Sequence, residues 1–250
     1  MAHIEIFGVE GLPEIESGAD LAAMIHAAAI TQGDPLADGD VVIVTSKIVS
    51  KAEGRGIELA DVEASPFATT WAEKWEKDPR LVEVVLRESK RVIRQIGPVL
   101  ITETHHGFCC ANSGVDQSSS GAEGRVLVLP EDPDATCRAH RARFAELGVD
   151  VAVIMSDTFG RPWREGQTDI AIGIAGMQPL YSYIGQHDPH GHEFRVQELC
   201  IADELAAAGE LVKGNTSRVP VAVIRGHEWV RDETASLAPV LRDSEKDLFR

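Results

Sequence analysis

Residues 151–155 read Val-Ala-Val-Ile-Met, five apolar side chains in a row. A continuous apolar run of this length is typical of a β-strand that is covered on both faces. Residues 41–44 (Val-Val-Ile-Val) and 219–224 (Val-Pro-Val-Ala-Val-Ile) have the same character. Because helix-like segments separate these strands along the chain, the sequence predicts an α/β or α+β fold.

Further elements are predicted outward from these three strands. Helical spacing predicts helices over 20–29 and 198–212, and Asp132-Pro133 supplies the N-cap and first residue of a helix that stops at Gly148. Residues 66–95 predict two helices separated at Asp78-Pro79, the second with apolar residues at helical spacing as far as Val92. Shorter strands are predicted over 4–9, 99–104 and 126–129, and a terminal helix or a mobile tail after residue 226.

The composition of the chain disfavours some classes of binding partner. The chain of 250 residues has 24 Lys+Arg against 40 Asp+Glu, a formal net charge of −16, which disfavours binding to nucleic acid or to an anionic membrane. Four irregularly spaced cysteines do not form a disulfide framework, and no apolar run approaches the roughly 18 residues of a membrane span. We therefore expect a protein of the reducing cytoplasm.

Nucleotide binding, if present, does not use a common fingerprint. The sequence lacks GxxxxGK[ST], and no GxGxxG follows a predicted strand. Polar residues do gather where predicted strands end, which is where α/β architectures place their sites.

The first such segment is 41–55, where a buried strand is followed directly by the two hydroxyls of Thr45 and Ser46 and then by three cations. Lys47 and Lys51 are four residues apart, so a helical turn would place both ammonium groups on one face, as binding to phosphate oxygens requires. A solvated basic turn is the alternative interpretation.

Two further segments carry candidate metal ligands. Asp116 stands in a loop of hydroxyls and glycines, where it is either a ligand for a hard cation such as Mg²⁺ or an ordinary turn residue. Residues 156–169 are predicted as a polar loop in which Asp157 and Thr158 offer a carboxylate and a hydroxyl to a divalent cation.

The same 156–169 segment has groups suited to anions. The planar guanidinium groups of Arg161 and Arg164 can donate paired hydrogen bonds to phosphate or carboxylate. Phe159 and Trp163 are predicted to be exposed and to contact a ligand or a partner. A plain surface loop is the alternative. A fourth segment, 209–220, contains Gly214, which suits a helix C-cap.

Taken together, the chain resembles the coenzyme F420 gamma-glutamyl ligases, which add glutamate to a deazaflavin coenzyme precursor. The matching stretches occur in family order over residues 4–226: Val9 to Pro13, Ser46-Lys47 with Ala52 to Arg55, Asn112 to Ser118, Ser156 to Thr158 with Gly160-Arg161, Ala171 to Gly176, Ala202 to Glu204, and Pro220 to Gly226.

The resemblance implies an α+β fold of two dissimilar subdomains that form an interlocked homodimer. It also implies binding of GTP and of two divalent cations, Mg²⁺ or Mn²⁺, with a monovalent cation such as K⁺ as a further possibility. Residues 1–250 would form one ligase module without the reductase domain that follows it in some bacterial relatives.

Site residues follow from the resemblance position by position. The implied nucleotide contacts are Leu12, Pro13, Glu14, Ile15, Ser46, Lys47, Lys51 and Ser119; the implied metal ligands are Asp116, Asp157, Thr158 and Asn215; and the implied catalytic residues are Asp157, Arg161 and Lys51. Two positions depart from the family pattern: Ser119 replaces a frequent Asn, and Asn215 stands at a carboxylate or amide metal contact.

The implied reaction is GTP-dependent formation of an amide between L-glutamate and the phospholactyl carboxylate of the precursor, through an acyl phosphate. Phosphoryl transfer asks a protein mainly for positioning and charge neutralisation, which agrees with cations and metal ligands and no covalent nucleophile. A ligase with another acceptor and a metal-dependent phosphohydrolase are the alternatives.

Overall fold

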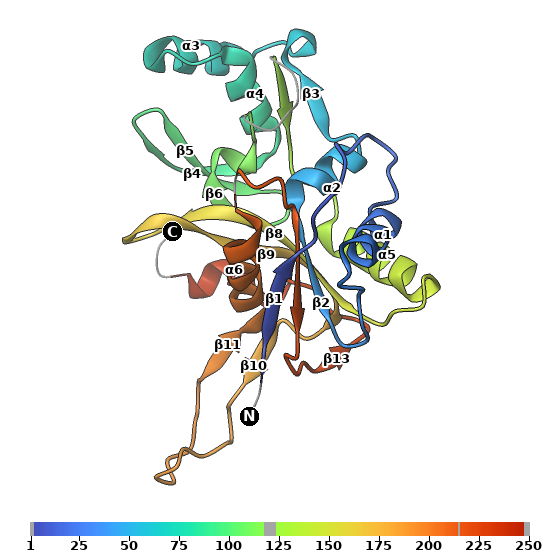
Figure 1. Cartoon of the computed structure of the whole chain (residues 1–250). Coiled ribbons are helices and arrows are strands. Elements are labelled where there is room, and N and C mark those ends of the chain that lie inside the picture. The colour runs from blue at the N-terminus through green and yellow to red at the C-terminus, as the bar shows by residue number, and fades with distance from the viewer. Residues whose placement is uncertain (1–2, 118–123, 215, 248–250) are drawn as a thin grey trace.

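The computed structural model describes residues 3–117, 124–214 and 216–247. The chain is a mixed α+β protein built around a central sheet, with a second group of helices and strands at one end (Figure 1). None of the helices in the described residues is both long and apolar enough to cross a membrane.

The central sheet has six strands in the order β1-β12-β2-β8-β9-β13. Strands β2 and β8 are parallel, and the remaining neighbours are antiparallel. The strands are β1 (Glu5–Gly8), β2 (Val41–Thr45), β8 (Ala152–Arg161), β9 (Arg164–Met177), β12 (Val221–Arg225) and β13 (Arg231–Asp232). The three predicted apolar strands are therefore confirmed, and they lie side by side in the middle.

Helices cover both faces of this sheet, as the continuous apolar runs predict. Helices α1 (Leu21–Gln32) and α5 (Pro133–Glu146) lie on one face, where Val42 and Val44 join their core. Helix α6 (Ile201–Lys213) covers the other face, toward which Val41 and Ile43 point. A Cβ on Gly209 of α6 would lie 2.9 Å from Cδ1 of Ile43, so a glycine there lets the helix approach the sheet closely.

The second group of elements lies between the short helix α2 (Ser46–Ala52) and α5, and it occupies the upper part of Figure 1. It has two small cores of its own, one around Trp71 and Leu100 and one around Leu59 and Val126. Its elements are β3 (Gly56–Glu58), η1 (Leu59–Asp61), α3 (Pro66–Trp75), α4 (Pro79–Arg87), β4 (Ser89–Ile96), β5 (Val99–Thr104), β6 (Cys109–Ala111), η2 (Asn112–Gly114) and β7 (Arg125–Leu127).

The predicted helix through Val92 was too long. Helix α4 ends at Arg87, and residues 89–96 form β4, which pairs with β5 across a turn at Gly97. Gly97 has a φ of 55°, a left-handed conformation that glycine adopts without strain. Val92 is 42% exposed and does not belong to the buried face of α4. Its spacing fits a helix by chance, and pairing with β5 makes this segment a strand.

The prediction of a polar loop over 156–169 was also wrong. Strands β8 and β9 continue through it as a long hairpin that extends beyond the rest of the sheet (Figure 1). Phe159 is buried, contrary to prediction, whereas Trp163 at the turn is 79% exposed.

Two later segments differ from their predictions. Residues 198–200 belong to β11 (Glu198–Cys200), which pairs with β10 (Leu180–Ser182) in a hairpin at the foot of Figure 1, so α6 begins only at Ile201. Residues 227–247 form neither a long helix nor a loose tail. They contribute β13, the short turn η3 (Ser244–Lys246), and the buried side chains of Ala235 and Leu237.

The two-sided burial of the central strands predicts a large stability difference between two isoleucines. Ile154 in β8 is fully buried, whereas Ile30 in α1 is 54% exposed. We expect Ile154→Ala to lower the free energy of unfolding by about 2–5 kcal/mol, measured by urea denaturation, because the cavity adds to the lost burial. Ile30→Ala is the matched control, with a change under about 1 kcal/mol. Equal effects would contradict this packing.

Candidate active site

The parallel pairing of β2 with β8 brings two polar segments to the same edge of the sheet. Thr45 is the register partner of Ser156, so Ser46 and Asp157 are neighbours immediately beyond that pair. The Ser46 hydroxyl donates a hydrogen bond to Asp157 Oδ1 at 3.0 Å. The candidate segments 41–55 and 156–169 therefore meet at one place.

The carboxyl group of Asp157 at this edge has a shifted pKa. Burial raises the pKa of its carboxyl to about 6, and the nearby Asp169 carboxylate adds to the rise. Hydrogen bonds from Ser46 and from the main chain of Thr158, together with the charge of Lys47, act in the opposite direction on this pKa. A carboxylate with such a pKa is stabilised by any further cation placed beside it.

Lys47 connects Asp157 with the second predicted metal ligand. Its ammonium group pairs with Asp116 Oδ2 at 3.1 Å, and its charge acts on Asp157. Asp116 is held by main-chain hydrogen bonds in both directions with Leu127 of β7. The carboxylate of Asp116, which is attached to the second group of elements, therefore lies at the edge of the central sheet.

A buried network on the other face of the hairpin was not predicted. Asp169 of β9 is 1% exposed and Lys213, the last residue of α6, is 2% exposed. The Lys213 ammonium donates to Asp169 Oδ2 at 2.6 Å. Ser156 and Thr158 donate their hydroxyls to the two oxygens of Asp169, at 2.8 and 2.7 Å.

This network positions the strand that carries Asp157. It fixes the residues on either side of Asp157, because Ser156 and Thr158 point away from it by the alternation of a strand. Sequence inspection passed over both charged partners because Lys213 resembles an ordinary C-terminal helix cation and Asp169 an ordinary loop residue. The available signal was an Asp directly before an apolar strand.

The remaining nucleotide candidates lie along α2 and the segment that precedes α1. Lys47 and Lys51 are both in α2, four residues apart, as predicted. Lys51 forms an ion pair with Glu14. Leu12 and Ile15 pack into the core, with Ile15 only 6% exposed, while Pro13 and Glu14 are exposed beside Lys51.

Arg161 lies far from Asp157 in the structure. It stands at the outer end of β8, opposite Arg164, so four residues of extended strand, about 13 Å, separate it from Asp157. Ser119 and Asn215 lie outside the described residues, so their predicted roles are not tested.

The donor set agrees in kind with a hard divalent cation. Asp116 and Asp157 offer carboxylate oxygens, the ligands that Mg²⁺ and Mn²⁺ prefer. The hydroxyl of Thr158 lies on the other side of the strand, where it donates to Asp169, so the structure does not bring it to these two carboxylates. Within residues 3–117, 124–214 and 216–247, however, no three His, Cys, Asp or Glu side chains are already arranged to hold a metal ion. Lys47 supplies positive charge next to Asp116 and Asp157, whereas Lys213 pairs with Asp169 on the other face of the hairpin.

Comparison with known proteins relates this chain to a family. Residues 11–226 match the model of the F420-0:Gamma-glutamyl ligase family. A protein of Methanothermobacter thermautotrophicus called coenzyme F420:L-glutamate ligase is 41% identical over 99% of both chains. Proteins of the same name from Methanopyrus kandleri and Methanocaldococcus jannaschii are 42% and 36% identical, over 100% and 99% of this chain and 100% and 97% of their own lengths.

These matches extend over the central sheet, the second group of elements and the edge at which Asp116 and Asp157 meet Lys47. The three relatives are matched over 97% or more of their own lengths. The chain therefore belongs to the F420-0:gamma-glutamyl ligase family.

Proposed function

We propose that this protein is a GTP-dependent ligase that joins L-glutamate to the phospholactyl carboxylate of the deazaflavin precursor of coenzyme F420. The names of its relatives support the glutamate and the coenzyme. The observation that carries the proposal is the meeting of Ser46, Lys47, Asp116 and Asp157 at one sheet edge, because it combines cations for phosphates with acidic metal ligands.

The proposed reaction has two steps. A carboxylate oxygen of the precursor attacks the γ-phosphorus of GTP, the bond from that phosphorus to the β,γ-bridging oxygen breaks, and GDP leaves. The neutral amine of glutamate then attacks the acyl carbon, a C–N bond forms, inorganic phosphate leaves, and the nitrogen loses a proton to solvent. Activation of the carboxylate is needed because amide formation in water is otherwise unfavourable.

The residues of this chain act in the first step by position and charge. Lys47 and Lys51 present their ammonium groups from one face of α2, where they would meet the phosphates as these lose contact with water. Asp157 and Asp116, with Asn215, would hold two divalent cations that neutralise charge on the phosphates. Thr158, the further ligand that the resemblance implies, would join them only if its hydroxyl turned away from Asp169. Ser46 and the Asp169 network would keep Asp157 in place during transfer.

The same proposal includes a homodimer and a two-subdomain organisation. The separate small cores of residues 56–127 support a second subdomain. Sedimentation of the purified protein tests the dimer, with a mass of twice 27.0 kDa as the expected result.

The proposed reaction predicts a strict substrate requirement. Sustained release of GDP over many turnovers should depend on both the precursor and L-glutamate, and mass spectrometry should detect the precursor enlarged by one glutamyl residue. Equal GTP hydrolysis without glutamate would instead indicate a phosphohydrolase, and glutamylation of a different carboxylate would indicate another acceptor.

Asp157→Asn separates catalysis from folding. The change keeps size and removes charge, so the turnover number should fall about a thousandfold, which corresponds to about 4 kcal/mol of transition-state stabilisation. The free energy of unfolding at pH 7.5 should not fall. The raised pKa of Asp157 means that its ionised carboxylate costs stability above a pH of about 6, a cost that disappears below the ordinary pKa near 3.8. Near-normal turnover of this variant at saturating Mn²⁺ would refute the metal assignment.

Lys51→Ala tests the nucleotide position. The Michaelis constant for GTP should rise severalfold, because the variant loses a cation and leaves Glu14 unpaired near the phosphates. The Michaelis constant for glutamate should stay nearly constant. Lys77→Ala, at an exposed lysine between α3 and α4, is the control for the loss of one charge. A change in glutamate dependence alone would place Lys51 in the amino-acid site.

A further inference from the structure

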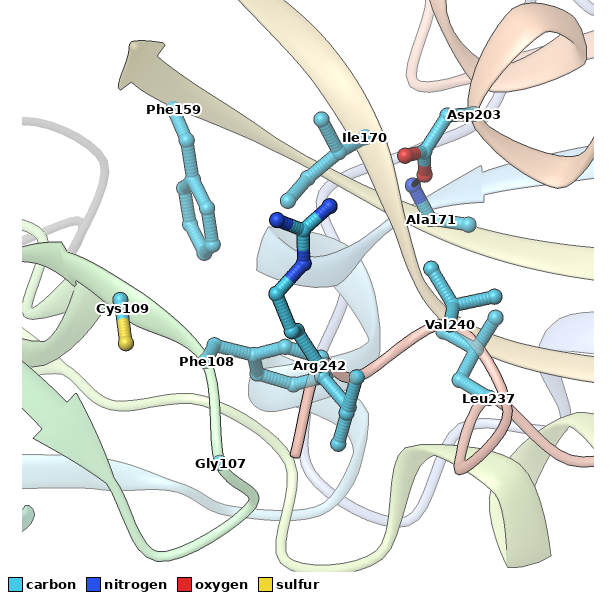
Figure 2. A pocket seen from close by; sticks show the side chains of 11 residues that line it. Gly107, Phe108, Cys109, Phe159, Ile170, Ala171, Asp203, Leu237, Val240 and Arg242 are labelled. Carbon is cyan, nitrogen blue, oxygen red and sulfur yellow. Dashed lines mark hydrogen bonds between the residues drawn. The ribbon is translucent and has the colours of Figure 1, made fainter. Parts of the chain in front are cut away.

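A cavity opens beside the candidate active site, between the β8–β9 hairpin and the segment that follows β13. Its volume is about 210 Å³, far above the roughly 10–15 Å³ that one water needs. Its walls come from three parts of the chain: residues 107–109, the hairpin with the start of α6, and residues 237–242 (Figure 2).

The cavity has apolar walls and two groups of opposite charge. Phe108, Phe159, Ile170 and Val240 form much of the wall, with the two phenyl rings packed edge to face at 6.4 Å. The guanidinium of Arg242 points into the space toward Phe159 and Ile170 (Figure 2). Small-molecule sites typically combine such apolar walls with a few polar groups that fix orientation.

Arg242 has no counterion in this part of the molecule. Across the described residues, its guanidinium has no hydrogen-bond or ion-pair partner, although acidic residues outnumber basic ones in the chain. Arg242 is an exposed residue. Its guanidinium fork matches a carboxylate through two parallel hydrogen bonds. Arg242 is therefore suited to bind the carboxylate of a ligand.

Asp203 supplies the opposite charge at another wall. Its carboxylate accepts a hydrogen bond from the main-chain N–H of Ala171 at 2.9 Å, which fixes its place (Figure 2). It also lies beside the thiol of Cys200, whose pKa burial raises to about 12 and which is therefore protonated at neutral pH. A ligand with a carboxylate and an ammonium group matches this pair of charges.

Part of the cavity wall lies on the same face of the hairpin as the Asp157 carboxylate, whereas Asp203 comes from α6, which covers the other face. Ile170 is the cross-strand partner of Asp157, and Phe159 follows Asp157 by two residues, so all three side chains project to one side of the hairpin. The buried Asp169 network occupies the opposite side. A ligand in the cavity is consequently next to the edge where phosphoryl transfer is proposed.

We propose that this cavity is the L-glutamate subsite, with Arg242 binding a carboxylate of the amino acid and Asp203 facing its amino group. The inference rests on the proposed ligase function and adds the location of its second substrate. The size of the cavity and its two opposite charges suit an amino acid, whereas a deazaflavin has a large ring system and no ammonium group.

Steady-state kinetics of Arg242→Gln tests the assignment. We expect the Michaelis constant for L-glutamate to rise about tenfold or more, because one charged carboxylate contact is lost. The constants for GTP and the precursor should change less than about twofold. Arg242→Lys should restore part of the loss, since it returns the charge without the fork. Lys246→Gln, at an exposed cation four residues further along the same segment, should change none of the three constants.

A second variant fills the space without changing charge. Val240→Phe enlarges a half-buried wall residue and should also raise the Michaelis constant for glutamate while leaving that for GTP unchanged. The subsite is refuted if Arg242→Gln leaves glutamate dependence unaltered, or if it raises the constant for the precursor instead. If the unmodified protein adds no glutamate to the precursor, the proposed function fails, and the subsite fails with it. Normal ligation by the unmodified protein with unaffected variants refutes the subsite alone.

Discussion

The parallel pairing of β2 with β8 is the constraint on which the other features depend. Val42 and Val153 face one helical layer, whereas Val41 and Ile154 face the other, so a shift of one residue would exchange both sets of side chains. Helical layers on both faces therefore hold the register. That register is what places Ser46 against Asp157, because the two residues follow the last pair of the ladder.

Charge at this edge is arranged in two layers with different exposure to water. On the inner side, Lys213 and Asp169 are almost fully buried and satisfy one another, with hydroxyls completing the hydrogen bonding. Such a pair contributes little net stability, since desolvation offsets the attraction, but loss of one partner is costly. On the outer side, Asp157 and Lys47 are half-buried and able to meet a ligand. The inner pair thus provides a rigid support for the outer groups.

Much of the fold was predictable because two-sided burial and helix caps are local features of sequence. The strands over 41–44 and 151–155 and the helix after Asp132 are confirmed, and the latter begins with the predicted side-chain cap. The errors have a common cause: residues 89–96 and 156–169 form hairpins whose pairing is decided by tertiary contacts. Asp157, Lys47 and Asp116 were identified as candidates, but the Asp169–Lys213 pair joins residues 44 positions apart, a link that no local pattern encodes.

The cavity is lined both by the β8–β9 hairpin, which carries Asp157, and by residues 237–242, which do not belong to the hairpin. The strand that carries Asp157 also carries Phe159, so substitutions there alter the sheet edge around Asp157 and the neighbouring cavity together. Val240 and Arg242 border the same cavity from a segment with no part in the β2–β8 ladder. If the cavity is the proposed amino-acid subsite, changes over residues 237–242 would alter which amino acid is accepted without altering the edge formed by β2 and β8.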